Sequence, residues 1–148
     1  ATGDTPLELI LEMTAQFVSQ GISSLSLADS TGMANPLLIK ETVTAVAEVA
    51  GDIPIVLHLH DTRGLGLANV VAALACGVSH FDTSLGGLGG CPFIPGATGN
   101  IATEDTVYLL ESLGIETNIN RHAVSDVTKQ VASFLGRELP GKLYKIGN

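Results

Sequence analysis

The sequence predicts an α/β fold in which helices alternate with parallel strands. Segments with apolar residues at helical spacing alternate with short, almost continuous apolar segments, and the latter are typical of strands buried on both faces. Short connections containing Gly, Asp or Asn separate them. The composition agrees, since 45% of the 148 residues are hydrophobic, 15% are charged and 17 are glycine. We therefore expect βαβ units with right-handed crossovers.

The helices are predicted from their start and stop signals. Residues 5–8, Thr-Pro-Leu-Glu, predict a helix start with threonine as the N-cap and glutamate closing a capping box, and Gly21 ends this helix. Asn35-Pro36 opens a second helix that ends at Gly51. Three more helices are expected over residues 65–76, 101–113 and about 123–135.

Three strands are expected, over residues 22–28, 53–60 and 78–84. An α/β barrel needs eight strands, and a free-standing doubly wound sheet usually has about five or six. Three parallel strands would leave two open edges. The segment is therefore predicted to be part of a larger fold.

Charge and composition exclude several classes of partner. The net charge of −8 argues against binding to nucleic acid or to an anionic membrane. Every apolar run is too short to span a membrane, and the first residues lack the pattern of a secretory signal. The two cysteines, Cys76 and Cys91, have no metal-ligand spacing, so we expect a cytoplasmic enzyme with free thiols and Cys76 in the core.

His58 and His60 form the first candidate site. They are two residues apart on a predicted strand, so both side chains should point to one face, at the carboxyl end where barrel enzymes place their catalytic groups. Two imidazoles there could supply half of a divalent-metal site. The alternative is a pair of buried, hydrogen-bonded histidines. His80 and His122 are more simply explained as structural.

Three aspartates lie near the same predicted edge. Asp29 ends the first strand and Asp82 lies within the third, and either could accept a hydrogen bond from a metal-binding histidine. Asp61 follows the histidine pair and could orient the site or cap the next helix. Capping or other structural roles remain open for all three.

The segment 84–100 combines six glycines, two prolines and a cysteine, which exclude a regular helix or strand. Such a loop can bring a catalytic residue to the substrate when it closes, and Cys91 could then donate or accept a proton. The alternative is an incidental surface thiol. Asn100 could be a helix N-cap or a neutral oxygen ligand that completes a site for Mg²⁺ or Mn²⁺.

These motifs resemble the 3-hydroxy-3-methylglutaryl-CoA lyase family, within the metal-dependent lyase and aldolase superfamily built on a TIM barrel. The resemblance is carried by His-Leu-His-Asp-Thr-Arg-Gly at 58–64, Gly-Leu-Gly-Gly-Cys-Pro-Phe at 87–93 and Pro-Gly-Ala-Thr-Gly-Asn at 95–100. Residues 25–32 resemble the sixth barrel strand of the family. The chain is thus similar to the C-terminal portion of a single TIM-barrel lyase domain over residues 1–148, about the last three strands with their helices.

The resemblance implies cleavage of 3-hydroxy-3-methylglutaryl-CoA, an acyl-CoA substrate, to acetyl-CoA and acetoacetate, as in leucine degradation. His58, His60 and Asn100 would bind Mg²⁺ or Mn²⁺. Cys91 would protonate the acetyl-CoA enolate, His58 would also transfer protons, and Asp29 would orient the substrate hydroxyl. We further expect a homo-oligomer.

One departure from the family is clear. The Arg-Asp-Gly motif of the first barrel strand, whose aspartate is a metal ligand, is absent from these residues, and Arg63 is not positioned to replace its arginine. We therefore expect a further N-terminal barrel segment in the active protein. Two alternatives stay open: a condensing superfamily member of the citramalate or isopropylmalate synthase type, and a non-catalytic, metal-binding half-barrel.

Overall fold

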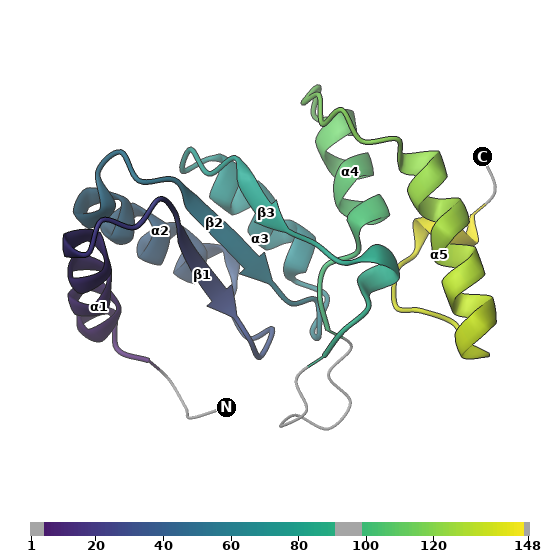
Figure 1. Cartoon of the computed structure of the whole chain (residues 1–148), viewed down its shortest axis with the longest axis horizontal. Helices are drawn as coiled ribbons and strands as arrows, with labels where there is room; N and C mark the ends of the chain where they lie inside the picture. The colour runs from purple at the N-terminus through teal and green to yellow at the C-terminus, as the bar shows by residue number, and fades with distance from the viewer. Residues whose placement is uncertain (1–4, 91–98, 147–148) are drawn as a thin grey trace.

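A computed structural model describes residues 5–90 and 99–146 of the chain. Its centre is a parallel sheet in the order β1-β2-β3, with β1 at Leu25–Asp29, β2 at Ile55–Leu59 and β3 at His80–Asp82 (Figure 1). The helices are α1 (Leu7–Ser19), α2 (Pro36–Ala50), α3 (Gly66–Leu74), α4 (Thr103–Ser112) and α5 (Arg121–Leu135), and two 3₁₀ turns are η1 (Leu85–Gly87) and η2 (Leu143–Lys145). Alternating helices and parallel strands confirm the predicted α/β class and make a partial barrel.

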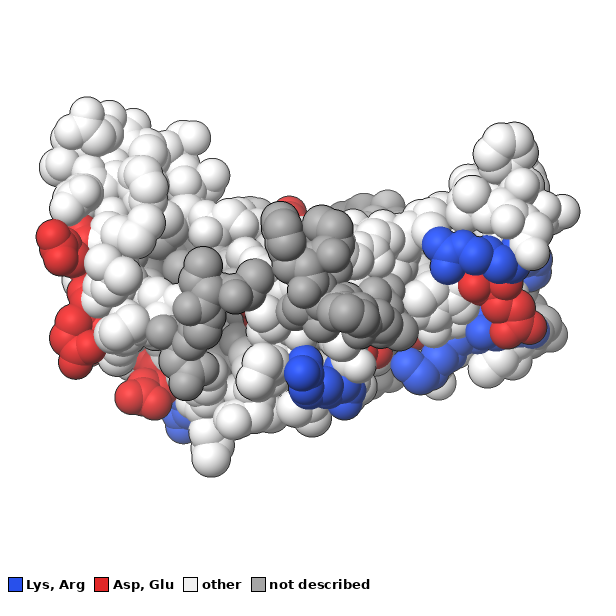
Figure 2. Space-filling model, turned by 90° about the horizontal axis from the view of Figure 1, so that it is seen from below, with Lys and Arg blue, Asp and Glu red and all other residues white. Residues whose placement is uncertain are grey.

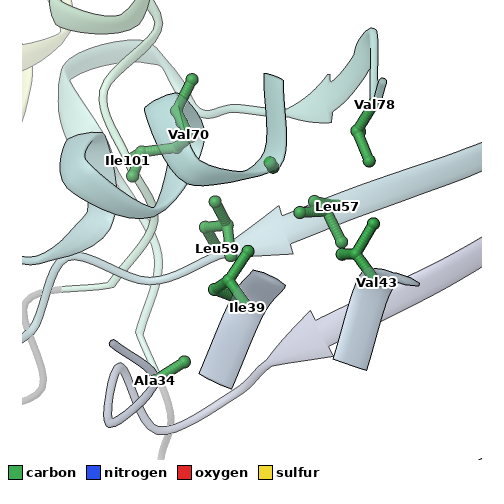
Figure 3. Close-up of a cluster of buried hydrophobic side chains, with 9 residues drawn as sticks. Ala34, Ile39, Val43, Leu57, Leu59, Val70, Val78 and Ile101 are labelled. Carbon is green, nitrogen blue, oxygen red and sulfur yellow. The ribbon is translucent and has the colours of Figure 1, made fainter. Parts of the chain in front are cut away.

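The hydrophobic core lies between the sheet and the helices α2 and α3, which are behind the sheet in Figure 1. Leu57 and Leu59 of β2 are each 1% exposed and point toward Ile39 and Val43 of α2 and Val70 of α3 (Figure 3). Because side chains alternate along a strand, His58, between these two leucines, faces the other side of the sheet.

The predicted element order is confirmed, and the differences lie at the ends of elements. Asn35 caps α2 as expected, since its side-chain oxygen accepts hydrogen bonds from the backbone N–H groups of Leu37 and Leu38. The capping box expected at residues 5–8 is wrong: Pro6 occupies the N-cap position of α1, and no side chain caps this helix. β3 is shorter than predicted because it pairs with β2 over three residues only.

Helices α4 and α5 stand to one side of the sheet, and the C-terminal segment packs against both of them (Figure 1). The Asp105 carboxylate in the first turn of α4 accepts hydrogen bonds from the backbone N–H groups of Lys142 and Leu143. The backbone N–H of Gly141 donates to the carbonyl oxygen of Gly86, so this segment is joined to η1. In the part of the chain that is described, no helix is long and apolar enough to cross a membrane.

Candidate metal centre

The two histidines occupy the face of β2 that the core does not use. His58 alternates with the buried Leu57 and Leu59, and it is aligned in the sheet with Ala28 on one side and Asp82 on the other. His60 directly follows the last residue of the strand. The sheet therefore places both imidazoles at its carboxyl end, as the spacing predicted.

The imidazoles of His58 and His60 point their Nε2 atoms toward each other. These two nitrogens are 3.3 Å apart, and the ring centroids are 5.2 Å apart. Two nitrogens bound to one divalent cation at about 2.1 Å lie roughly 3.0–3.4 Å apart in octahedral or tetrahedral geometry. The separation therefore fits two ligands of one metal ion.

His60 is the more buried of the pair, with 7% of its surface exposed. Burial lowers the pKa of His60 below the ordinary 6.5, and a positive charge on His58 would lower it further, whereas Asp29 and the Asn100 side chain act weakly in the opposite direction. A neutral imidazole is the form that binds a metal ion. The Nδ1 atom of His60 is buried without a hydrogen-bond partner.

Asn100 lies directly beside His60, with which it forms an isolated antiparallel bridge. Its side-chain Nδ2 donates a hydrogen bond to the carbonyl oxygen of Leu88 at 2.7 Å, so the orientation of the amide is defined. Its Oδ1 atom is buried and accepts no hydrogen bond, although the Asn100 side chain lies near enough to His60 to raise the pKa of that imidazole. The N-cap alternative is wrong, because Ala102 occupies that position in α4. An amide oxygen without a partner beside two imidazoles suits an oxygen ligand of Mg²⁺ or Mn²⁺.

Asp82 and Asp29 have different surroundings. The Asp82 carboxylate lies 3.6 Å from Nδ1 of His58, which is beyond hydrogen-bond distance but near enough for its charge to favour a proton on that nitrogen. The Asp29 carboxylate instead accepts hydrogen bonds from the backbone N–H groups of Met33 and Ala34, and thus holds its own loop. No hydrogen bond between Asp29 and a histidine is present among the described residues.

Asp61 has a structural role that explains its place after the histidines. One oxygen accepts a hydrogen bond from the Gly66 backbone N–H at 2.8 Å, which orients the start of α3, and the other lies 3.7 Å from Nζ of Lys142. The lysine comes from the C-terminal segment, so Asp61 connects the histidine strand to the far end of the described chain.

The described residues supply only part of a metal site. Within 5–90 and 99–146, no three His, Cys, Asp or Glu side chains are close enough together to bind a metal ion. Cys91, the expected loop thiol, lies outside the described residues. His80 and His122 are exposed, away from the core, and Cys76 is half-buried against the core rather than within it.

Glu104 is a further buried carboxylate that the sequence did not single out. It is 0% exposed in the first turn of α4, and one oxygen accepts a hydrogen bond from the Gly86 backbone N–H at 3.1 Å. Acidic residues are common in the first turn of helices, so its sequence position gives no sign of this contact.

A partial parallel barrel with a histidine pair at its carboxyl edge defines one segment of a TIM-barrel enzyme. The model of the HMGL-like family matches residues 1–131. The chain therefore belongs to the HMGL-like family.

Known relatives agree with this membership. Hydroxymethylglutaryl-CoA lyase YngG of Bacillus subtilis is 42% identical over 139 residues, which is 94% of this chain and 46% of the relative. (R)-citramalyl-CoA lyase of Chloroflexus aurantiacus is 40% identical over 95% of this chain and 44% of its own length. The structure of an HMG-CoA lyase from Acinetobacter baumannii, in complex with coenzyme A and 3-methylmalate, has a TM-score of 0.93 and 42% identity over 99% of this chain and 48% of its own. The chain thus spans about half the length of the relatives it matches.

Proposed function

We propose that the protein to which these residues belong is a divalent-metal-dependent carbon–carbon lyase that cleaves 3-hydroxy-3-methylglutaryl-CoA to acetyl-CoA and acetoacetate. The observation that carries this proposal is the group formed by His58, His60 and Asn100. Two imidazole nitrogens 3.3 Å apart and a buried amide oxygen without a partner lie together at the carboxyl end of the sheet. The membership of lyases in the same family supports the choice of reaction.

His58, His60 and Asn100 would hold Mg²⁺ or Mn²⁺ as one nitrogen–oxygen ligand set, completed by groups from outside the described residues. When bound, the cation would polarise the hydroxyl and carboxylate oxygens of the substrate. Asp82 would keep the His58 ring oriented from its Nδ1 side. The loop that Asp29 organises would lie beside the hydroxyl end of the substrate and help to orient it.

The proton steps need one base and one acid. Loss of the substrate hydroxyl proton forms the new carbonyl of acetoacetate, and the electrons of the breaking C–C bond pass to the acetyl-CoA enolate. We assign proton transfer at the hydroxyl to His58, whose Nε2 would have to leave the cation to accept the proton, because its Nδ1 faces Asp82. The thiol of Cys91 would deliver a proton to the enolate carbon and would regain one before the next cycle. A loop that closes over this carbon would keep bulk water away.

Basic side chains could receive the phosphate groups of the CoA portion. Five of the seven Lys and Arg residues lie between 121 and 145. On the face seen in Figure 2, basic side chains gather toward the α4–α5 end, whereas most of the acidic ones lie at the α1–α2 end. This asymmetry favours approach of an anionic thioester from the α4–α5 side, despite the net charge of −8.

Titration of the metal-free full-length protein with Mn²⁺, followed by the loss of the free Mn²⁺ EPR signal, tests the metal site directly. His58→Ala and His60→Ala should each weaken Mn²⁺ binding by about 100-fold or more, because each removes one ligand. His122→Ala, at an exposed histidine of α5, is the matched control and should bind like the wild type. Binding that survives both site variants would contradict the proposal.

Citramalyl-CoA is the second candidate substrate, because the (R)-citramalyl-CoA lyase relative is 40% identical, almost as similar as YngG. Release of acetyl-CoA from the two thioesters should be compared at equal enzyme concentration. We expect a higher kcat/KM for 3-hydroxy-3-methylglutaryl-CoA. A higher value for citramalyl-CoA would reassign the substrate, and condensation without cleavage would favour the synthase alternative.

A cytoplasmic location and a homo-oligomeric state remain part of the proposal. Fractionation of cells that produce the protein at its natural level tests the first, and light scattering of the purified protein tests the second.

A further inference from the structure

Glu104 has no role in the proposed reaction, yet it is the most completely buried carboxylate of the described chain, at 0% exposure. A buried charged group is costly unless hydrogen bonds satisfy it. Oε2 accepts one hydrogen bond, from the backbone N–H of Gly86, whereas Oε1 has no partner. Such an arrangement reduces stability relative to an apolar side chain, so its benefit should lie elsewhere.

The partner of Glu104 lies in a tightly held turn. Gly86 has a φ of +61°, and a Cβ there would meet Leu139 Cδ1 at 2.6 Å and Thr128 Cγ2 at 2.8 Å. Its N–H donates to Glu104 and its carbonyl oxygen accepts from Gly141. The peptide groups on both sides of Gly86 are therefore fixed by contacts outside the turn.

The same turn also holds the candidate ligand Asn100. The backbone N–H of Leu88 donates to Leu85 within the turn, and the Leu88 carbonyl oxygen accepts the 2.7 Å hydrogen bond from Asn100 Nδ2. That bond leaves Oδ1, rather than Nδ2, free to face a cation. Glu104 thus connects through Gly86 and Leu88 to the group that fixes the orientation of the Asn100 amide.

We propose that Glu104 is a positioning residue for the metal site: by holding the 85–88 turn it keeps the Leu88 carbonyl where it orients Asn100 Oδ1 as a ligand. The inference rests on the proposed function, because it requires Asn100 to bind the metal ion. Groups that orient metal ligands typically contribute about 10–100-fold to metal affinity.

Mn²⁺ titration of the metal-free full-length protein by EPR tests this inference without relying on activity. Glu104→Ala should weaken Mn²⁺ binding by about 10-fold or more. Glu104→Gln keeps the shape and an acceptor for the Gly86 N–H, so it should restore affinity to within about threefold of wild type. If Glu104→Ala does not fold, Glu104→Asp provides the comparison, because its shorter side chain draws the carboxylate away from Gly86.

Thr106→Val is the matched control for stability. Thr106 is also buried in α4, and its hydroxyl donates to the carbonyl oxygen of Ala102 rather than to the turn. This variant should lower the thermal midpoint while leaving Mn²⁺ affinity unchanged. If Mn²⁺ affinity falls in proportion to the thermal midpoint in both Thr106→Val and Glu104→Ala, Glu104 acts only on stability, and the inference is overturned.

A double-mutant cycle with Asn100→Ala identifies the route of the effect. If Glu104 acts through Asn100, Glu104→Ala should have almost no further effect on Mn²⁺ affinity once Asn100 is removed. Equal losses in both backgrounds would overturn the inference and leave the metal site intact. Absence of any histidine-dependent Mn²⁺ binding in the wild type would instead overturn the proposed function, and the inference with it.

Discussion

The imidazole of His60 is buried, and this burial lowers its pKa below 6.5, with the neighbouring His58 acting in the same direction. In the unfolded chain the same group would take up a proton near pH 6.5. Between its folded pKa and pH 6.5 the unfolded state therefore binds more protons than the folded state. This residue should cost the protein no stability above that window and an increasing amount as the pH falls through it.

The pH dependence of unfolding tests this difference in pKa. In metal-free protein, the free energy of unfolding should fall as the pH is lowered from 7 toward 5, because His60 must remain neutral to stay buried. His60→Gln should show a smaller fall over the same range. Urea denaturation at a series of pH values, with a chelator present, measures both. Equal slopes in the two proteins would contradict the lowered pKa.

Cys91 carries the most specific chemical assignment. Cys91→Ser in the full-length protein should reduce kcat by several orders of magnitude, because a hydroxyl is a much weaker acid than a thiol. Mn²⁺ affinity should not change, since the thiol is not among the proposed ligands. Steady-state kinetics and EPR titration on one preparation separate the two effects. Unchanged turnover would remove Cys91 from the proposed reaction.

At the scale of elements, the loop after β1 depends on a close approach of two chain segments. Gly32 has a φ of +63°, and a Cβ there would lie 2.8 Å from Cβ of Thr62. Nη1 of Arg63 also donates to the carbonyl oxygens of Thr31 and Gly32. The loop that Asp29 organises is thus packed directly against the segment that follows the histidine pair.

Alanine substitutions can separate this contact from backbone strain. Gly136 has the same φ of +63° in the left-handed region, and a Cβ there would meet nothing within 4 Å, so Gly136→Ala should cost about 1–2 kcal/mol from the backbone alone. Gly32→Ala should cost more, because Thr62 must also move. Chemical denaturation of both variants measures the difference. Equal costs would mean that the loop adjusts freely.

Local signals explain which elements the sequence could predict. Asn35-Pro36 determines the start of α2 through contacts within three residues, so the prediction of that helix is confirmed. The start of α1 differs from the prediction by one residue, because the N-cap position is occupied by Pro6 rather than Thr5. The length of β3 depends on pairing with a distant strand, which local spacing does not encode.

In the candidate site too, local sequence predicts some features, whereas others depend on contacts between distant segments. Period-two alternation was enough to place His58 and His60 on one face. The amide orientation of Asn100 depends on the Leu88 carbonyl, and the burial of Glu104 depends on the Gly86 turn. Both contacts join segments more than ten residues apart and use backbone atoms, so the side-chain sequence carries no direct sign of them.

At the scale of the whole molecule, the described chain leaves much apolar surface and backbone uncovered. β1 and β3 each pair on one side only within the described residues. On α1, Leu9, Met13 and Phe17 are spaced four residues apart, and each is almost half exposed. Helix surfaces of this kind normally pack against a neighbouring element.

A polypeptide limited to these 148 residues should therefore self-associate when it is folded alone. Light scattering should show a mass that rises with concentration in the micromolar range, and the protein should bind a hydrophobic dye such as ANS. Both signals should disappear in a longer protein that also contains the remainder of the barrel. A dye-free monomer of the isolated polypeptide would contradict this expectation.

Because leucine and histidine alternate in β2, the core and the candidate metal centre both depend on the same register of that strand. Leu57 and Leu59 belong to the core, and His58 and His60 belong to the candidate metal centre. One inserted or deleted residue before Leu57 would exchange the two faces, placing imidazoles among aliphatic side chains and leucines at the metal. Substitutions can adjust either face separately, but a change in strand length would damage both together.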